Sequence, residues 1–240
     1  MKFNFCLLSI LMMGINALSI NRKDFLKYPG SFIVSKSLDS NKLKQDTSPI
    51  IDNAYLSNEN SNPEVLENNN NDIYFYGPVN MRSCIILKNY LIDLDNKSNI
   101  FKAQYKISPP PINLHIQSPG GSLLHAFYII DLIRTLETPV HTYIDGFAAS
   151  AATLMSVVGK KRFITKNSLM LIHQLSGSEG GKYSELKDEM ANFDTMMNNI
   201  DNIYLEYSKL NKTKLHELLS HDLWLNSELA LEYGLVDEII

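Results

Sequence analysis

From residue 73 onward the sequence alternates between short runs typical of β-strands and longer runs with a helical period. The strand-like runs are rich in β-branched and aromatic residues and lie at 73–76, 112–116, 140–144, 162–164, 169–172 and 236–240. Helical periods separate several of them, at 81–94, 123–136 and 148–158. Strands that take turns with helices pair in parallel through right-handed crossovers, so the sequence predicts an α/β domain over residues 72–240.

A proline-rich segment separates the first helical period from the second strand. Residues 96–111 are polar and end in Pro109, Pro110 and Pro111. Because proline removes a backbone donor and clashes with the preceding helical turn, we expect this segment not to continue the helix and to bulge from the surface.

The first 71 residues differ in character from the rest. Residues 1–19 carry one charged side chain, Lys2, before an apolar run that is shorter than the roughly 20 residues of a membrane span. This pattern is typical of a cleaved signal peptide, with a core helix or a membrane anchor as the alternatives. Residues 20–71 lack an apolar period and are rich in Asn, Ser and Lys, so we expect a transit-like, low-complexity leader without ordered structure.

A basic, hydroxyl-bearing segment after a signal peptide is typical of proteins sent to a plastid of secondary origin, comparable to an apicoplast. The leader therefore predicts a plastid location, with the mitochondrion as the alternative destination. It is also compatible with a linker in a secreted protein. No membrane association is expected of the mature chain.

Charge and cysteine content exclude several classes of function. The net charge of −4 and the pI near 5.9 leave no basic surplus to neutralise phosphates, so we expect no nucleic-acid partner. Of the two cysteines, Cys6 lies in the apolar N-terminal run and Cys84 stands alone, which excludes a disulfide framework and a cysteine-based metal cluster. No histidine pair has the spacing of a zinc site. We expect neither a metal nor a cofactor, and chemistry independent of thiols unless Cys84 acts by itself.

An apolar stripe runs along the helical period at 183–210. Its members recur at alternating spacings of four and three residues: Leu186, Met190, Phe193, Met197, Ile200, Tyr204 and Tyr207. At about 1.5 Å per residue this helix would be about 40 Å long, which exceeds what a domain of this size covers on one side. Part of the stripe therefore needs a partner outside its own domain.

Two turns connect a predicted strand to a predicted helix and are rich in small residues. At 118–122 the sequence Ser-Pro-Gly-Gly-Ser leaves backbone amides bare, which suits a phosphate or an oxyanion equally. It lacks the lysine of a P-loop and the third glycine of a dinucleotide fingerprint. At 145–152 four alanines surround Ser150, a candidate nucleophile at a helix start. A plain turn and a helix cap are the respective alternatives.

His173 and Asp222 are the candidate partners of that serine. His173 ends the apolar run at 169–172, where a strand end brings a base out of the core. Asp222 precedes the only tryptophan, and a carboxylate beside apolar bulk can hold an imidazole in one tautomer. A turn residue or a helix terminator is the alternative for Asp222.

Four motifs in this order resemble the proteolytic subunit of the Clp protease, the ClpP family. They are Ser-Pro-Gly-Gly at 118–121, Gly-x-Ala-Ala-Ser at 146–150, Met-x-Ile-His-Gln at 170–174 and Glu-Tyr-Gly-Leu-Val-Asp at 232–237. The resemblance extends over about residues 73–240. It implies the ClpP and crotonase-like fold, a repeated β-β-α superhelix with a protruding long handle helix.

The resemblance also implies the site residues. By position, Ser150 would be the nucleophile, His173 the general base and Asp222 the residue that orients the histidine. The oxyanion donors would be the backbone amides of Gly121 and Ala151. A substrate peptide would lie extended beside the glycine-rich segment, at Gly177, Gly180 and Gly181.

As to partners, the family implies stacked seven-membered rings made of this chain or of paralogous subunits. It also implies an AAA+ Clp ATPase that feeds in unfolded polypeptides and uses the ATP, so this chain would need no cofactor of its own. Two alternatives remain: a non-catalytic ring subunit, and a crotonase-type acyl-CoA enzyme, against which the serine, histidine and aspartate argue.

The sequence departs from the family pattern at several positions. Leu175 replaces a proline that commonly follows His-Gln, and His221 stands where an arginine usually precedes the catalytic acid. The turn at 159–162 is shorter than usual, and the segment 96–111 is additional. Contacts between rings are therefore expected to differ.

Overall fold

In the computed structural model, the described residues form an eight-stranded sheet whose main path runs β1-β2-β3-β4-β5-β8. The parallel strands are β2 (Asp72–Tyr76), β3 (Ile112–Ser118), β4 (Val140–Ala149), β5 (Lys161–Ile164) and β8 (Glu238–Ile239). Strand β6 (Leu169–Leu171) pairs in parallel with the end of β4, and β7 (Trp224–Leu225) pairs antiparallel with β6. The predicted α/β class with parallel pairing is confirmed.

The structure describes residues 64–67, 71–178 and 180–240, all within the unit Pro49–Ile240. The signal peptide proposed at 1–19 and most of the leader proposed at 20–71 lie outside the described residues. One part of that leader does not: strand β1 (Glu64–Glu67) pairs antiparallel with β2. The prediction of no ordered structure is therefore wrong for these four residues, because the edge of β2 supplies backbone hydrogen-bonding partners to a short strand.

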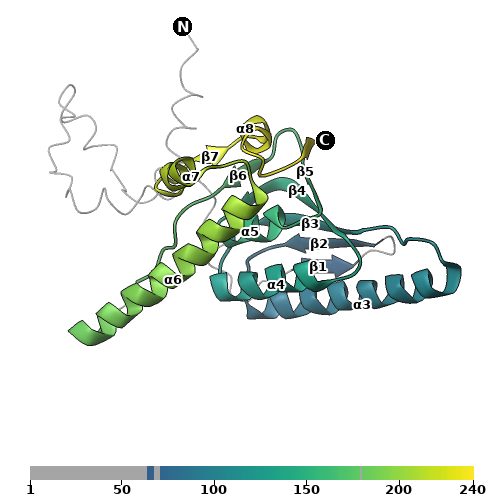
Figure 1. Cartoon of the computed structure of the whole chain (residues 1–240), viewed down its shortest axis with the longest axis horizontal. Helices are drawn as coiled ribbons and strands as arrows, with labels where there is room; N and C mark the ends of the chain where they lie inside the picture. The colour runs from purple at the N-terminus through teal and green to yellow at the C-terminus, as the bar shows by residue number, and fades with distance from the viewer. Residues whose placement is uncertain (1–63, 68–70, 179) are drawn as a thin grey trace, which may run out of the picture. The chain divides into compact units, whose positions relative to one another are not determined.

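Three helices cover one face of the sheet: α3 (Met81–Tyr105), α4 (Leu123–Thr135) and α5 (Ala151–Val157) (Figure 1). Alternate residues of the strands point into this layer, so Ile112, Leu114 and Ile116 of β3 are fully buried. The opposite face carries a row of half-buried rings, in strand order Tyr74, His115, Tyr143 and Phe163, whose neighbouring centroids are 4.6–4.8 Å apart. Both faces of the central strands are thus occupied by bulky side chains.

Helix α3 corrects the interpretation of the segment at 96–111. The helix continues through residues 96–105 and ends at Lys106, which adopts a left-handed conformation with φ 58°. Buried Ser98 and the hydrogen bond from the Thr138 N–H to Asp95 Oδ1 (2.7 Å) keep this extension on the domain. The prolines that disfavour a helix begin only at Pro109, after the helix has ended. The prediction that the helix stops before residue 96 is therefore wrong, because the polar residues at 96–105 are compatible with a helix.

The last three helices are α6 (Tyr183–Tyr207), α7 (Lys212–Leu219) and α8 (Ser227–Glu232). Asn211 and Asn226 cap α7 and α8, each accepting a backbone N–H at 2.9 Å. Among the described residues, none of the helices combines the length and the hydropathy that crossing a bilayer requires.

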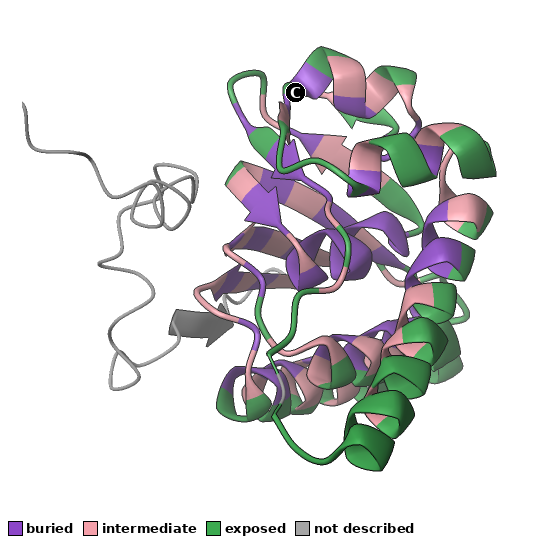
Figure 2. Ribbon diagram, turned by 90° about the vertical axis from the view of Figure 1, so that its left-hand side faces the viewer, coloured by how far each residue is buried: buried purple, intermediate pink, exposed green. Residues whose placement is uncertain are grey.

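Helix α6 is buried at one end and bare at the other. Ile200 and Tyr204 are 4% and 1% exposed, whereas Leu186 and Met190 of the same apolar stripe are 40% and 59% exposed. Figure 1 shows the first half of α6 extending away from the sheet, and Figure 2 shows exposed residues along it. The domain therefore covers only part of the stripe, as its length predicts.

Candidate active site

Ser150 lies at the junction between β4 and α5, in a backbone conformation that residues other than glycine rarely adopt. Its φ is 55° and its ψ is −129°. Such a residue costs on the order of 1–3 kcal/mol and persists only where its surroundings hold it. The end of β4 is held by β6, and the Ser150 N–H donates to the Leu171 carbonyl at 2.8 Å. A sharp turn of this kind, between a strand and a helix, is the arrangement that presents the nucleophile in a nucleophile elbow.

The Gly120 and Gly121 turn packs directly against this junction. Both glycines have positive φ, 87° and 143°, and a Cβ on Gly120 would meet the Ala149 carbonyl oxygen at 2.5 Å. A Cβ on Gly121 would overlap the Val79 carbonyl oxygen. Val79 holds the turn from the other side, since its N–H donates to the Gly120 carbonyl and its carbonyl accepts from the Ser122 N–H, both at 2.8 Å. Only glycine fits both positions.

The amides of Gly121 and Ala151 are free to act on a ligand. Within the part of the chain that the structure describes, neither N–H donates a hydrogen bond to another residue. Both residues line the same small cavity as Ser150. Unpaired backbone donors beside a serine hydroxyl are the arrangement that stabilises an oxyanion.

His173 and Asp222 come from two segments that follow β6 and α7. The Gln174 N–H donates to the Leu219 carbonyl at 2.8 Å, which ties the end of β6 to the end of α7. His173 Nδ1 then faces Asp222 Oδ1 at 3.7 Å, with side chains 21% and 63% exposed. This separation is longer than a hydrogen bond, so the pair is adjacent without being bonded.

Ser150, His173, Gly121 and Ala151 share one cavity of about 60 Å³. The cavity is also lined by the apolar residues Leu123, Leu154, Leu175 and Ile200 and by Gln174, Ser176 and Tyr204, which carry polar groups. Across the described residues no hydrogen bond joins the Ser150 hydroxyl to His173. The structure therefore places the four predicted residues around one cavity, with Asp222 beside His173. The side chains of Ser150, His173 and Asp222 are not hydrogen-bonded to one another.

The glycines proposed to bind substrate lie beyond this cavity. Residues 172–178 and 180–182 form neither helix nor strand, and Gly177, Gly180 and Gly181 are exposed. Gly177 runs close to α6, because a Cβ there would meet the Phe193 ring at 2.6 Å. Ser176 is the last residue of this segment that lines the cavity, so the three glycines follow directly after the cavity lining.

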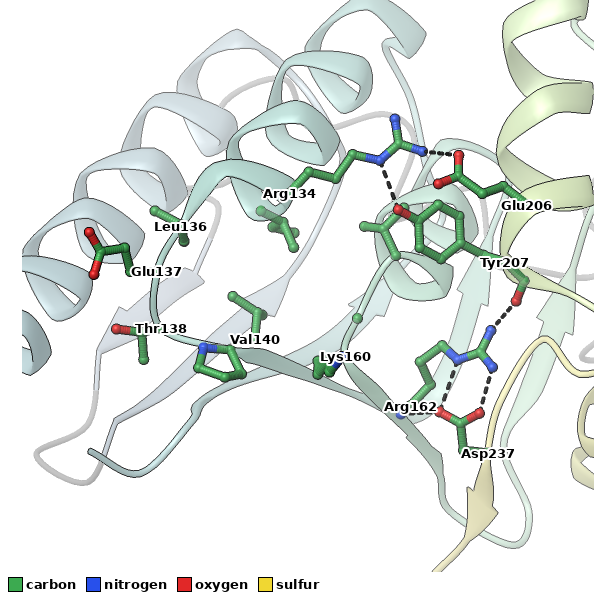
Figure 3. A pocket seen from close by; sticks show the side chains of 14 residues that line it. Arg134, Leu136, Glu137, Thr138, Val140, Lys160, Arg162, Glu206, Tyr207 and Asp237 are labelled. Atoms are coloured by element: carbon green, nitrogen blue, oxygen red, sulfur yellow. Dashed lines mark hydrogen bonds and ion pairs between the residues drawn. The ribbon is translucent and has the colours of Figure 1, made fainter. Parts of the chain in front are cut away.

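A second and larger cavity, of about 790 Å³, shares no lining residue with the first (Figure 3). Four of its six charged residues form two pairs, Arg134 with Glu206 at 3.0 Å and Arg162 with Asp237 at 2.5 Å. Its lining contains no serine, cysteine or histidine among the described residues. This cavity therefore lacks a nucleophile and a base of the kind found around Ser150.

Cys84 lies in the core, outside the lining of the small cavity. Its side chain is 1% exposed, and burial raises the pKa of its thiol to about 11, so it is protonated at neutral pH. No group of three or more His, Cys, Asp or Glu side chains in the described part of the chain is arranged to hold a metal ion.

Sequence reasoning missed two residues beside the site. Val79 acts through its backbone, and Thr153 is a small buried hydroxyl in α5. Neither role leaves a pattern in the sequence, so no signal pointed to them.

Comparison with known proteins identifies the family. The family model described as Clp protease matches residues 93–240, which is more than half of the chain. The chain belongs to the Clp protease family. The matched region contains the Gly120 and Gly121 turn, Ser150, His173 and Asp222, and it begins within α3. The resemblance drawn from the four motifs is confirmed.

The chain is similar to several proteolytic subunits of ATP-dependent Clp proteases. Subunit 1 of Protochlamydia amoebophila is 33% identical over 134 residues, covering 54% of this chain and 65% of that protein. Subunit 2 of Treponema denticola is 28% identical over 186 residues, covering 76% and 93%. The subunit of Streptococcus salivarius is 30% identical over 175 residues, covering 70% and 83%. The chain spans just under two thirds of the Protochlamydia protein and most of the other two.

Proposed function

We propose that this chain is a serine endopeptidase, the proteolytic subunit of an ATP-dependent Clp protease that hydrolyses unfolded polypeptides. The observation that carries the proposal is the shared cavity of Ser150, His173 and the free amides of Gly121 and Ala151, on a chain of the Clp protease family. Three kinds of group needed for acyl transfer thus meet at one point.

In the proposed reaction His173 takes the proton of the Ser150 hydroxyl, and Oγ attacks the carbonyl carbon of a peptide bond. Nδ1 of His173 faces Asp222, which leaves Nε2 for the serine. A movement of about half an ångström would bring the Nδ1 to Oδ1 separation into hydrogen-bond range. Such bonds are often long in unliganded enzymes and tighten on substrate binding.

The negative oxygen that forms on the carbonyl would be bound by the amides of Gly121 and Ala151. Removal of one such donor lowers rates by about 100- to 1000-fold in serine proteases. His173 would then give its proton to the leaving amine, and water would hydrolyse the acyl enzyme by the same steps. None of these steps requires a metal or a cofactor from this chain.

We further propose that the exposed half of α6 contributes to an assembly of stacked heptameric rings, of this chain alone or with paralogous subunits. The bare stripe at Leu186 and Met190 supports an interface there, because large apolar side chains in a row are seldom left in water. An AAA+ Clp ATPase would deliver unfolded substrate and consume the ATP. The segment that includes Gly177, Gly180 and Gly181 would pair with the substrate backbone.

We also propose that residues 1–71 direct the chain to a plastid of secondary origin. The support is the order of an apolar run before a basic, hydroxyl-bearing stretch. A fluorescent protein fused to residues 1–71 should enter that organelle, and accumulation in mitochondria or in the medium would contradict the proposal.

The activity is tested with fluorogenic peptides and the variants Ser150→Ala, His173→Ala and Asp222→Asn. We expect the first two to lose activity by about 1000-fold or more and the third by a large factor, with particle mass unchanged. His221→Ala, next to Asp222 and exposed, is the matched control and should retain activity. A wild-type chain that assembles and cleaves nothing would instead indicate a non-catalytic ring subunit.

A further inference from the structure

A buried tyrosine from α6 lies beside the Ser150 junction. Tyr204 is 1% exposed and lines the same cavity as Ser150 and His173. Its hydroxyl is 2.6 Å from Thr153 Oγ1, which belongs to a fully buried residue of α5. Desolvation raises the pKa of Tyr204, so the phenol keeps its proton at neutral pH.

The direction of these hydrogen bonds follows from counting protons. Thr153 Oγ1 is 2.6 Å from the Ser150 carbonyl oxygen, which can only accept, so the threonine proton is used there. The short contact between the two hydroxyls must then use the Tyr204 proton. A directed chain results, in which Tyr204 donates to Thr153 and Thr153 donates to Ser150.

This series of hydrogen bonds ends at Ser150, the residue with the strained backbone conformation. The Ser150 carbonyl accepts from both the Thr153 N–H (3.0 Å) and the Thr153 hydroxyl, while the Ser150 N–H donates to Leu171. Both backbone polar groups of the strained residue are therefore fixed. Hydrogen bonds in series polarise one another. The hydrogen bond that Tyr204 donates to Thr153 therefore strengthens the one that Thr153 donates to the Ser150 carbonyl.

We infer that Tyr204 and Thr153 are positioning residues that hold the Ser150 turn in its strained conformation and so aim the hydroxyl into the cavity. The inference rests on the proposed function, since the orientation of the Ser150 hydroxyl matters only if Ser150 is the nucleophile. Packing alone does not account for the pair, because a phenylalanine and a valine would fill the same space without burying two hydroxyls.

The test separates positioning from stability with Thr153→Val, Tyr204→Phe and the double variant. Thr153→Val removes both hydrogen bonds and leaves the Tyr204 hydroxyl buried without its acceptor, which should lower the melting temperature by about 5 °C. The double variant has no stranded donor, so most of that loss should be recovered. Assembly is checked by light scattering in each case.

Reaction of the full chain with a fluorophosphonate probe reports how well Ser150 is aimed. We expect a rate about tenfold lower for Thr153→Val, about threefold lower for Tyr204→Phe, and still about tenfold lower for the double variant. Thr153→Ser keeps the hydroxyl and should react within about twofold of the wild type. Tyr207→Phe is the matched control, because its hydroxyl accepts from Arg134 Nε at 3.1 Å in the other cavity.

A double variant that regains its probe rate together with its melting temperature would overturn the inference, because the pair would then act through stability alone. Wild-type rates in both single variants would overturn it as well. In either case labelling of the wild type at Ser150 would leave the proposed function standing. A wild-type chain that the probe does not label would refute the proposed function and the inference with it.

Discussion

Replacing Gly121 with alanine tests the oxyanion site through a single added methyl group. At φ 143° the glycine uses backbone space that an alanine rarely occupies, and its missing Cβ leaves room for the Val79 carbonyl. That carbonyl is bound to the Ser122 N–H at 2.8 Å, so it cannot yield without disturbing the turn. The added carbon therefore strains residue 121 and displaces its amide.

The magnitudes indicate that activity, and not folding, is the sensitive readout. Backbone strain at residue 121 costs on the order of 1–3 kcal/mol. The shift that relieves the overlap between the added Cβ and the Val79 carbonyl costs about the same. A domain with about 5–15 kcal/mol of stability survives that loss in most cases. Misplacing one of two oxyanion donors should lower kcat by about 100- to 1000-fold. The variant should thus be folded and nearly inactive.

The assay is kcat for a fluorogenic peptide, measured well below the melting temperature of each variant. Gly146→Ala is the matched control: φ there is 83°, but the nearest atom to a Cβ is Gln117 Oε1 at 3.7 Å. It should lose about 1–2 kcal/mol of stability from strain and keep kcat within about twofold. Wild-type kcat in folded Gly121→Ala would refute the oxyanion assignment.

Two further predictions concern surfaces away from the cavity. The double variant Leu186→Lys with Met190→Lys should give smaller particles in light scattering while each chain stays folded. The control Asn192→Lys, on the polar face of α6, should leave the particle mass unchanged. An unchanged mass in the double variant would contradict an interface at Leu186 and Met190. Asp237→Asn should cost about 1 kcal/mol in denaturant unfolding, because Arg162 loses a charged partner at a partly exposed site. Hydrogen bonds from Arg162 lower the pKa of Asp237 in the folded state. The stability difference between wild type and variant should therefore be constant above about pH 5, begin to fall near the pKa of a free aspartate, about 4, and be lost as the pH falls through the lowered pKa of the folded state. A difference that grew in acid would contradict the pairing.

Periodicity was sufficient to predict the core of the fold and insufficient at its margins. In β3 every second residue, from Ile112 through Leu114 to Ile116, is apolar and buried, so the strand is evident from the sequence alone. Strands β1 and β7 were missed because strands this short are defined by their partners. Residues 96–105 were misread because a solvated helix tolerates Asn, Lys and Ser.

The candidate site was predictable to the extent that each residue sits at an end of a strand or helix. Ser150 and His173 follow β4 and β6, which are neighbours in the sheet, so they meet in one cavity. The 3.7 Å separation of His173 and Asp222 depends on how α7 packs, which no local pattern encodes. The link from Tyr204 to Thr153 joins residues 51 positions apart and becomes visible only in the fold.

The proposed mechanism requires that Ser150 is a nucleophile and that His173 activates it. The most direct measurement is to treat the full chain with a fluorophosphonate probe and to locate the adduct by peptide mass spectrometry. We expect a single adduct on Ser150 in the wild type, strongly reduced in His173→Ala and absent in Ser150→Ala. An unlabelled Ser150 in the assembled wild-type chain, or an adduct on another serine, would contradict it.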